Sequence, residues 1–409
     1  MERGLITQMQ TSLENQRILM IGDTWQYIKF HLVEKFNMKV TLFQSPDRKH
    51  LIREEYCEDV HIIDLNNFDE IIKQAKTLHQ TRSFKAVWSF ADVGTEPASI
   101  VAQKLGLKHN SVNATRIVNN KATLRDILNK KGLGPVNYTV TKSVKTALNF
   151  CEFNYPFIVK PLVGSGSQKI FKVNNDKELV DAVKKVTDNE KNEIIIEEYL
   201  KGREISVEGM SYSGSHSILQ LTDKITNPKN HVEMAHIMPA QLTDEMKGQV
   251  YKLVDKTLNA IGHTFGPTHI EIKLTKTGPK IIEAHTRPGG DFITELLDFV
   301  YNIDVIKLTM ENLITGKERK IPIPSTSKGG AVKFFDFPPG TISRIGGTEK
   351  VKRNSNLIIL DFNLKVGQQI KKTVDSYSRH GCLVVSGTTA ENAYETAEEM
   401  FKSINIEME

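Results

Sequence analysis

Short apolar runs alternate with longer amphipathic stretches over the first part of the chain. The runs have the length and composition of buried strands, and they are RILMIG (17–22), KVTLFQ (39–44), EDVHIIDL (58–65) and KAVWSF (85–90). Helical patterns lie between and after them. Strands that alternate with helices predict a parallel, wound sheet, so we expect an N-terminal α/β domain at 1–115. The sequence after the first strand is MIGDTWQ, which lacks the GxGxxG fingerprint of dinucleotide binding.

The middle of the chain has a mixed pattern. A helix at 120–132 ends with the stop signal of Gly132 and Pro135. The elements expected after it are strands at 156–162, 169–173, 193–200 and 203–210, a helix at 244–261 and the strand pair THIEIKL (268–274) and KIIEAHT (280–286). Two more helices lead to the proline-rich IPIPSTSKGG, where we place the last boundary. We therefore expect a second region at 116–325 and a strand-rich C-terminal part at 326–409, which gives an overall α/β and α+β multidomain protein.

The composition narrows the class of protein. The 409 residues are 39% hydrophobic and 25% charged, with a net charge of +5, which is ordinary for a globular chain. Acids and bases are interleaved without a basic block, which argues against nucleic-acid binding. The three cysteines, Cys57, Cys151 and Cys382, have no CxxC partner, which argues against a zinc site or a disulfide framework. No apolar stretch approaches the ~20 residues of a membrane span, so we expect a cytoplasmic protein without membrane contact.

Candidate chemistry is concentrated in IIEAHTRPGGDF (281–292). Glu283, His285 and Arg287 occupy alternate positions of an expected strand, so they share one face. A hairpin centred on Thr277 would place Glu271 opposite Glu283, His269 opposite His285, and Lys273 opposite Ile281. Opposed glutamates repel unless a cation lies between them, and paired carboxylates are ligands that Mg²⁺ uses. Arg287 could then hold an anionic group that is transferred.

Two other interpretations of these acids remain open from their spacing alone. The hairpin could be half exposed, with solvated carboxylates. The acids could also form the carboxylate pair of a glycosidase, although no aromatic cluster for sugar binding accompanies them.

Two further stretches could bind a nucleotide. In GSGSQKIF (164–171) the glycines permit close backbone approach to phosphates, and Lys160 stands at the end of the preceding apolar strand. In EIIIEEYLKGRE (193–204) a strand edge could bind adenine, and a following acid could accept ribose hydroxyls. A simple Gly-Ser turn and an amphipathic strand with surface glutamates are equally compatible with each stretch taken alone.

The order and spacing of these motifs resemble the ATP-grasp ligases. The shared elements are Lys121, Lys160-Pro161, the GSGS loop, IIIEEYL-x-G-x-E, HIEIKL and IIEAHTRPGG, and the resemblance extends over about residues 15–405. In detail the chain looks most like the L-amino-acid ligases of the bacilysin- and rhizocticin-pathway type. The resemblance implies an ATP-grasp fold with an N-terminal pre-ATP-grasp domain, a lid at about 135–200 and a C-terminal part that completes the catalytic domain.

The resemblance also implies roles for individual residues. Two lysines would contact the ATP phosphates, the loop would cover them, and the acidic stretch would frame adenine and ribose; the residues concerned are Lys121, Lys160, Gly164, Ser165, Gly166, Ser167, Glu197, Glu198, Tyr199, Leu200 and Glu204. Glu271 and Glu283 would bind one or two Mg²⁺ ions, with Mn²⁺ as a substitute. The residues implied at the substrate are Glu233, His236, Arg287, Gly290 and Asp291. Of these, His236 would handle a proton or an amino group, and Arg287 would stabilise the acyl phosphate.

The implied reaction is ATP-dependent joining of two unprotected L-amino acids to a dipeptide, with ADP and phosphate as by-products. Three acids expected near the pocket (Glu233, Asp291 and Asp336) suggest that a basic residue such as arginine is accepted at the N-terminal position. The alternatives are another ATP-grasp ligase or carboxylase, and a non-catalytic nucleotide-binding regulator. A homodimer is one possible assembly, and the sequence leaves the oligomeric state open. One departure stands out: His285 occupies a position where many ATP-grasp chains have an asparagine metal ligand.

Overall fold

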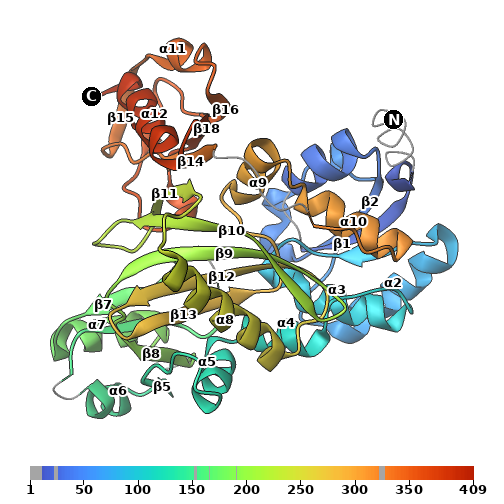
Figure 1. The fold of residues 1–409 in the computed structure, drawn as a ribbon, viewed down its shortest axis with the longest axis horizontal. Coiled ribbons are helices and arrows are strands. Elements are labelled where there is room, and N and C mark those ends of the chain that lie inside the picture. Colours follow the sequence, from blue (N-terminus) through green and yellow to red (C-terminus); the bar gives the residue numbers. More distant parts are fainter. Residues whose placement is uncertain (1–11, 23–25, 152–153, 165, 190, 322–327) are drawn as a thin grey trace.

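The computed structural model describes residues 12–22, 26–151, 154–164, 166–189, 191–321 and 328–409. The N-terminal part is a parallel sheet of order β3-β2-β1-β4 (Figure 1), with strands β1 (Arg17–Ile21), β2 (Lys39–Gln44), β3 (Asp59–Ile62) and β4 (Ala86–Trp88). Its helical segments are η1 (Tyr27–Lys35), η2 (Pro46–Leu51), η3 (Glu54–Tyr56), α2 (Phe68–Arg82) and α3 (Asp92–Lys104). Ile18, Leu19 and Met20 are all fully buried, as expected for a strand covered on both faces. The predicted wound sheet is confirmed.

A second sheet lies within residues 135–200, the region where we expect a lid and which we call the lid below. It has the order β5-β8-β6-β7, with strands β5 (Tyr138–Thr141), β6 (Phe157–Pro161), β7 (Phe171–Val173) and β8 (Ile194–Glu198), all antiparallel to their neighbours. Helices α6 (Val144–Cys151) and α7 (Asp176–Val186) pack on it with a core of their own, which includes Val159, Leu179 and Ile196. The lid therefore has an independent hydrophobic core, which is what a part that moves as a unit requires.

The largest sheet has eight antiparallel strands in the order β13-β12-β9-β10-β11-β14-β18-β16. Their bounds are β9 (Arg203–Tyr212), β10 (Ser215–Thr226), β11 (Glu233–Met238), β12 (Gly266–Thr275), β13 (Gly278–His285), β14 (Gly329–Phe334), β16 (Leu357–Asp361) and β18 (Cys382–Gly387). Helices α4 (Val112–Asn119), α5 (Lys121–Lys130) and α8 (Asp244–Ile261) cover part of it. Since three of the eight strands follow residue 328, the sheet continues across the expected boundary at 325/326.

The hairpin of β12 and β13 differs from its predicted register at one end. Glu271 faces Glu283 and His269 faces His285, as predicted. The third predicted pair is wrong: Lys273 faces Lys280, and Ile281 faces Ile272. The turn is one residue tighter than a hairpin centred on Thr277, and a bulge between Glu271 and Ile272 restores the register of the acids.

The C-terminal part adds helix α12 (Ala390–Ser403) against β14 and β18. Its other elements are β15 (Gly340–Gly346), α11 (Thr348–Lys352), β17 (Gln369–Ile370), η4 (Ser376–Ser378) and β19 (Asn405–Met408). Helices α9 (Ile293–Tyr301) and α10 (Val305–Thr315) return toward the N-terminal part (Figure 1).

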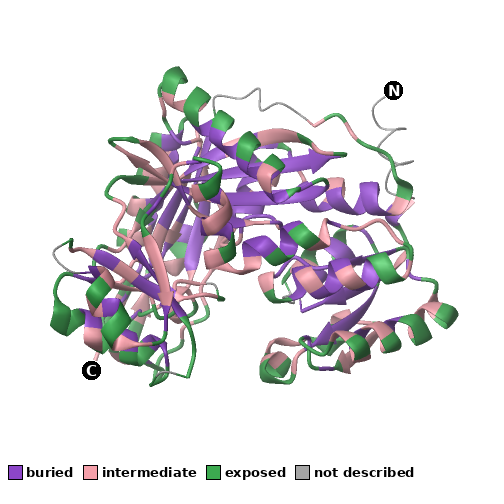
Figure 2. Cartoon of the chain, turned by 90° about the horizontal axis from the view of Figure 1, so that it is seen from below, coloured by how far each residue is buried: buried purple, intermediate pink, exposed green. Residues whose placement is uncertain are grey.

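One hydrophobic cluster joins the N-terminal part to the central sheet. It contains Met20 and Trp88 of the first sheet, Met210 and Val332 of the large sheet, and Leu296 of α9. Figure 2 shows buried residues along the strands and exposed residues on the outer faces of the helices. Among the described residues, every helix is too short or too polar to cross a lipid bilayer. The shared core thus packs the N-terminal part against strands β9 and β14 and helix α9.

Candidate active site

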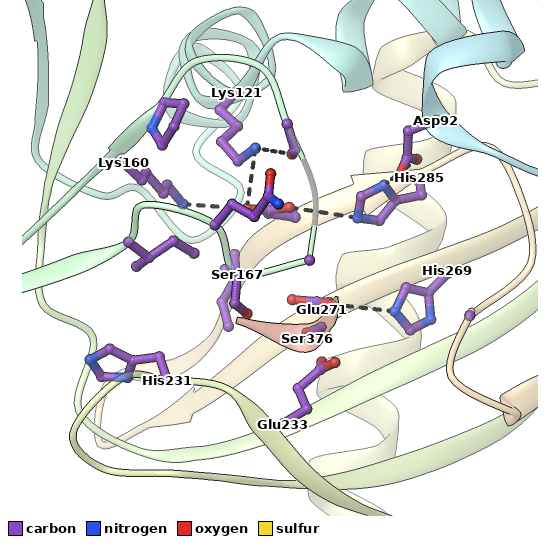
Figure 3. Close-up of a pocket in the computed structure, with 18 of the residues that line it drawn as sticks. Asp92, Lys121, Lys160, Ser167, His231, Glu233, His269, Glu271, His285 and Ser376 are labelled. Atoms are coloured by element: carbon purple, nitrogen blue, oxygen red, sulfur yellow. Dashed lines mark hydrogen bonds and ion pairs between the residues drawn. The ribbon is translucent and has the colours of Figure 1, made fainter. Parts of the chain in front are cut away.

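A cavity of about 1110 Å³ lies where the N-terminal part, the lid, the large sheet and the C-terminal part meet. Figure 3 shows side chains from all four parts around it. The predicted site residues that line it are Lys121, Lys160, Gly164, Gly166, Ser167, Glu197, Glu198, Tyr199, Leu200, Glu204, Glu233, His236, Glu271, Glu283, Arg287, Gly290 and Asp291. Ser165 lies outside the described residues. The structure thus brings together predicted residues that are up to 170 positions apart, from Lys121 to Asp291.

Two lysines meet Glu283 at the lid side of the cavity. Lys121 donates to the carbonyl oxygen of Gly164 at 2.8 Å, and its Nζ lies 3.6 Å from Glu283. Lys160 Nζ lies 3.8 Å from the same carboxylate and 2.8 Å from Glu197, with 3% of its side chain exposed. Two ammonium groups beside a glycine loop form a site suited to phosphate oxygens.

The side chain of Glu197 is already fully engaged. Arg125 Nε donates to it at 2.7 Å, in addition to Lys160 on its other oxygen. Burial alone would raise the pKa of Glu197, but the charges of Lys160 and Arg125 lower it to about 2. The backbone N–H of Glu198 donates to the Asn137 carbonyl and that of Tyr199 to the Pro156 carbonyl. Contacts of this stretch with an adenine base would therefore use other main-chain groups and Leu200.

Lys224 of β10 lies between two acids of the cavity. Its Nζ forms ion pairs with Glu233 and Glu271, and 1% of its side chain is exposed. Burial would lower the pKa of Lys224, but the two carboxylates raise it well above its usual value. Burial would raise the pKa of Glu271, but the charge of Lys224 lowers it well below its usual range. Lys224 and Glu271 are therefore both charged at neutral pH.

Glu271 also receives support from His269. The ring Nδ1 of His269 lies 2.9 Å from Glu208, whose carboxylate accepts a hydrogen bond from Ser206, and its Nε2 lies 3.4 Å from Glu271. Burial would lower the pKa of His269, but Glu208 raises it to about 9. The imidazolium thus joins two carboxylates and orients the one that faces the cavity.

Asp92, at the start of α3, holds the basic side chains of His285 at the end of β13 and of Arg287 just after it. Arg287 donates to Asp92 through Nε at 2.7 Å and Nη2 at 2.6 Å. His285 Nδ1 lies 2.9 Å from the same carboxylate, and Figure 3 shows His285 beside Asp92. Burial would raise the pKa of Asp92, but Arg287 and His285 lower it well below its usual range. The other side of the His285 ring, Nε2, faces Glu283 at 3.6 Å.

A histidine between two acids marks the opposite end of the cavity. His236 is 1% exposed, and its Nε2 lies 3.8 Å from Asp291 and 4.0 Å from Glu233. Neither ring nitrogen has a hydrogen-bond partner within the described part of the chain. Asp291 also pairs with Arg379 of the C-terminal part at 2.7 Å. Asp336, the third acid expected near the pocket, does not line the cavity.

Two family models match the chain. An ATP-grasp domain matches residues 153–295, and the L-amino acid ligase C-terminal domain 2 matches residues 333–409. The chain therefore contains an ATP-grasp domain and the C-terminal domain of L-amino acid ligases. Alanine–anticapsin ligase of Bacillus subtilis is 24% identical over 383 residues, covering 78% of each protein.

Solved ATP-grasp structures show the same fold. An L-amino acid ligase from Bacillus licheniformis matches with a TM-score of 0.83 at 22% identity, covering 97% of this chain and 99% of that one. The biotin carboxylase domain of Hydrogenobacter thermophilus 2-oxoglutarate carboxylase, solved with MgADP, has a TM-score of 0.70 at 16% identity, covering 95% and 90%. ATP-grasp enzymes use ATP and Mg²⁺.

The acids of this ATP-grasp protein fit a Mg²⁺ site. Glu271 and Glu283 face each other in the hairpin, and ligand atoms of Glu204, Glu233 and Glu271 lie within 4.8 Å of one another. Carboxylate oxygens are the ligands that Mg²⁺ prefers. Mg²⁺ held by Glu271 and Glu283 would neutralise charge on the nucleotide phosphates.

Five side chains that shape the site were not predicted from the sequence in that role. They are Asp92, Arg125, Lys224, His269 as a charged group, and Arg379. Each meets a partner far along the chain, such as Glu271 for Lys224 or Asp291 for Arg379. Only His269 had a local signal, because it lies two residues before Glu271 on the same strand face.

Proposed function

We propose that this ATP-grasp ligase joins two unprotected L-amino acids into a dipeptide through an acyl phosphate. The observation that best supports this function is a single cavity with different groups at its two ends. At one end Lys121 and Lys160 lie within 4 Å of Glu283, and at the other His236 lies between Glu233 and Asp291. The match of residues 333–409 to the L-amino acid ligase C-terminal domain supports amino acids as substrates.

The first step is phosphoryl transfer. A carboxylate oxygen of the first amino acid attacks the γ-phosphorus of ATP, the bond to the bridging oxygen breaks, and ADP leaves with the electron pair. Lys121 and Lys160 hold the phosphates. Arg287 keeps two N–H groups beyond those bonded to Asp92 and to the Pro288 carbonyl. These N–H groups stabilise the charge on the transferred phosphoryl group.

The second step forms the amide. The nitrogen of the second amino acid attacks the acyl carbon, and phosphate leaves from the tetrahedral species. The attacking ammonium must first lose a proton, and His236 is placed to accept it because neither ring nitrogen has a hydrogen-bond partner among the described residues. The lid excludes water that would hydrolyse the acyl phosphate.

The N-terminal position accepts a basic residue such as arginine. Glu233 and Asp291 support this part of the proposal, because both carboxylates line the cavity beside His236. Arg379 and Lys224 already neutralise part of their charge. The preference for a basic over a neutral residue is therefore modest.

Phosphate release across a panel of paired amino acids, followed by product mass, tests the proposal. We expect release only with productive pairs, a product one water lighter than the sum of its substrates, and loss of activity in Arg287→Ala. The matched control is Glu245→Gln, at an exposed position of α8, which should keep wild-type activity. Release without amino acids, or with bicarbonate in place of the amino acid whose carboxylate is activated, would contradict dipeptide synthesis, as would full activity of Arg287→Ala.

A further inference from the structure

Asp92 belongs to the N-terminal part, but its carboxylate bonds to two side chains of the large sheet's edge. His285 is the last residue of β13, and Arg287 follows two residues later. Asp92 Oδ1 accepts hydrogen bonds from Arg287 Nε and His285 Nδ1, and its Oδ2 accepts from Arg287 Nη2. A planar guanidinium bound through two donors to one carboxylate has a fixed orientation. Asp92 is thus the residue that determines which way Arg287 and His285 point.

The backbone around Asp92 is itself fixed. It follows β4 and begins α3, at the carboxyl edge of the parallel sheet. Two residues later, Gly94 packs so closely on β1 that an added Cβ would lie 1.8 Å from the Ile21 carbonyl oxygen. The first turn of α3 therefore cannot shift without clashing with β1.

Arg287 and His285 have competing partners on the cavity side. Glu283 lies 3.6 Å from His285 Nε2, and Glu271 lines the same cavity as Arg287. These are the two acids that fit Mg²⁺. If Arg287 turned toward them, it would take a position that the metal and phosphates need, and the acyl phosphate would lose its stabilising group.

We propose that Asp92 is a positioning residue, which holds Arg287 away from Glu271 and Glu283, aims it at the reacting phosphoryl group, and fixes the Nδ1 side of the His285 ring. Through Asp92 the N-terminal part thereby contributes to catalysis by positioning Arg287. The inference rests on the proposed function for the role of Arg287. A contact that only joined the two parts of the chain would affect stability and leave the kinetic constants unchanged.

The test compares Asp92→Asn with Glu96→Gln. Asparagine keeps the size and one acceptor oxygen but removes the charge. Glu96 lies on the same helix and pairs with Arg116 at 2.8 Å on the surface, so its variant controls for loss of any acid from α3. For Asp92→Asn we expect kcat to fall roughly 10- to 100-fold, with KM for ATP changed by less than about threefold. We also expect Mg·ADP to bind roughly tenfold more weakly by calorimetry, because Arg287 turns toward the acids. Asp92→Glu, which restores the charge, should recover part of both losses.

The outcomes separate this inference from the proposed function. An Asp92→Asn variant with a lower Tm but wild-type kcat and Mg·ADP affinity would overturn the positioning role. If wild-type protein releases no phosphate with any amino-acid pair, the proposed function fails. In that case the Mg·ADP titration of Asp92→Asn still decides the positioning role. If Asp92→Asn does not fold, Asp92→Glu is measured instead. Its longer side chain should displace Arg287, so we expect kcat to fall while Tm stays close to the wild-type value.

Discussion

Arg379 and Asp291 form an ion pair of 2.7 Å that ties the C-terminal part of the chain to the end of the cavity that contains His236. Arg379 also donates to the carbonyl oxygens of Ser376 and Glu233, and its guanidinium lies 3.6 Å from the ring centre of Phe334. Asp291 and the next residue, Phe292, have left-handed backbone conformations, with φ of 53° and 65°. Such conformations persist only where surrounding contacts hold them, so we infer that Arg379 holds this turn.

Replacing Arg379 with methionine should leave the partly buried carboxylate of Asp291 without its guanidinium partner. We expect the free energy of unfolding to fall by roughly 3 kcal/mol in urea titrations. The double variant Arg379→Met/Asp291→Asn should recover part of the loss, because no charge is then left unpaired. As a control, Arg344→Met removes an exposed pair with Glu407 and should cost less than about 1 kcal/mol. Equal losses in the single and double variants would show that the ion pair does not stabilise the turn.

Lys224 provides a built-in positive charge among the acids of the cavity. In Lys224→Met, the carboxylates of Glu233 and Glu271 lose their ammonium partner and repel each other. We expect a lower Tm in EDTA, but a larger rise of Tm on adding Mn²⁺ or Mg²⁺ than in wild type, because a metal can replace the lost charge. Binding at 100 times Kd contributes about 2.7 kcal/mol.

The control for Lys224→Met is Lys247→Met on α8, whose ammonium pairs with exposed Asp244 at 3.5 Å. It should show the wild-type response to metal. A Lys224→Met protein whose Tm rises no more than that of wild type would argue against cation binding by Glu204, Glu233 and Glu271.

The sequence predicted those features that depend on local pattern. Alternation of period two placed Glu283, His285 and Arg287 on one face, and the same alternation in β12 set Glu271 opposite Glu283. The tight turn and the bulge were not visible, because two compensating one-residue shifts leave the spacing of the acids unchanged. The short strand β5 was missed because YTVT has four residues, too few to show a clear alternation.

The side chains that complete the site had no such pattern. Asp92 meets Arg287 across 195 positions, and Lys224 meets Glu271 across 47. In the sequence each of them is one charged residue in a region of interleaved charges. Their function depends on which elements the fold places side by side, which a single sequence does not show.

The burial of His263 leads us to expect that the folded protein loses stability in acid. It is 2% exposed, and burial lowers its pKa to about 4 from the ordinary 6.5. The folded protein therefore binds fewer protons than the unfolded chain between these values, so stability falls as pH decreases from about 6.5 to about 4. The contribution of this residue is roughly 3 kcal/mol. Urea unfolding should show a smaller pH dependence in His263→Gln, whereas His50→Gln, at an exposed position, should behave as wild type. An unchanged dependence in His263→Gln would show that the acid sensitivity has another source.

The role of His285 can be determined from how its replacement changes the preference for Mn²⁺ over Mg²⁺. Its Nε2 lies 3.6 Å from Glu283, so a small shift would let it bind the same ion. Imidazole suits Mn²⁺ better than Mg²⁺, which prefers oxygen. If His285 is a ligand, His285→Asn should lower the ratio of kcat/KM with Mn²⁺ to that with Mg²⁺ by roughly tenfold, because the amide supplies an oxygen. His109→Asn, whose ring bonds to the Asn110 carbonyl and does not line the cavity, should leave the ratio unchanged. An unchanged ratio in His285→Asn together with a raised KM for an amino acid would instead assign His285 to substrate recognition.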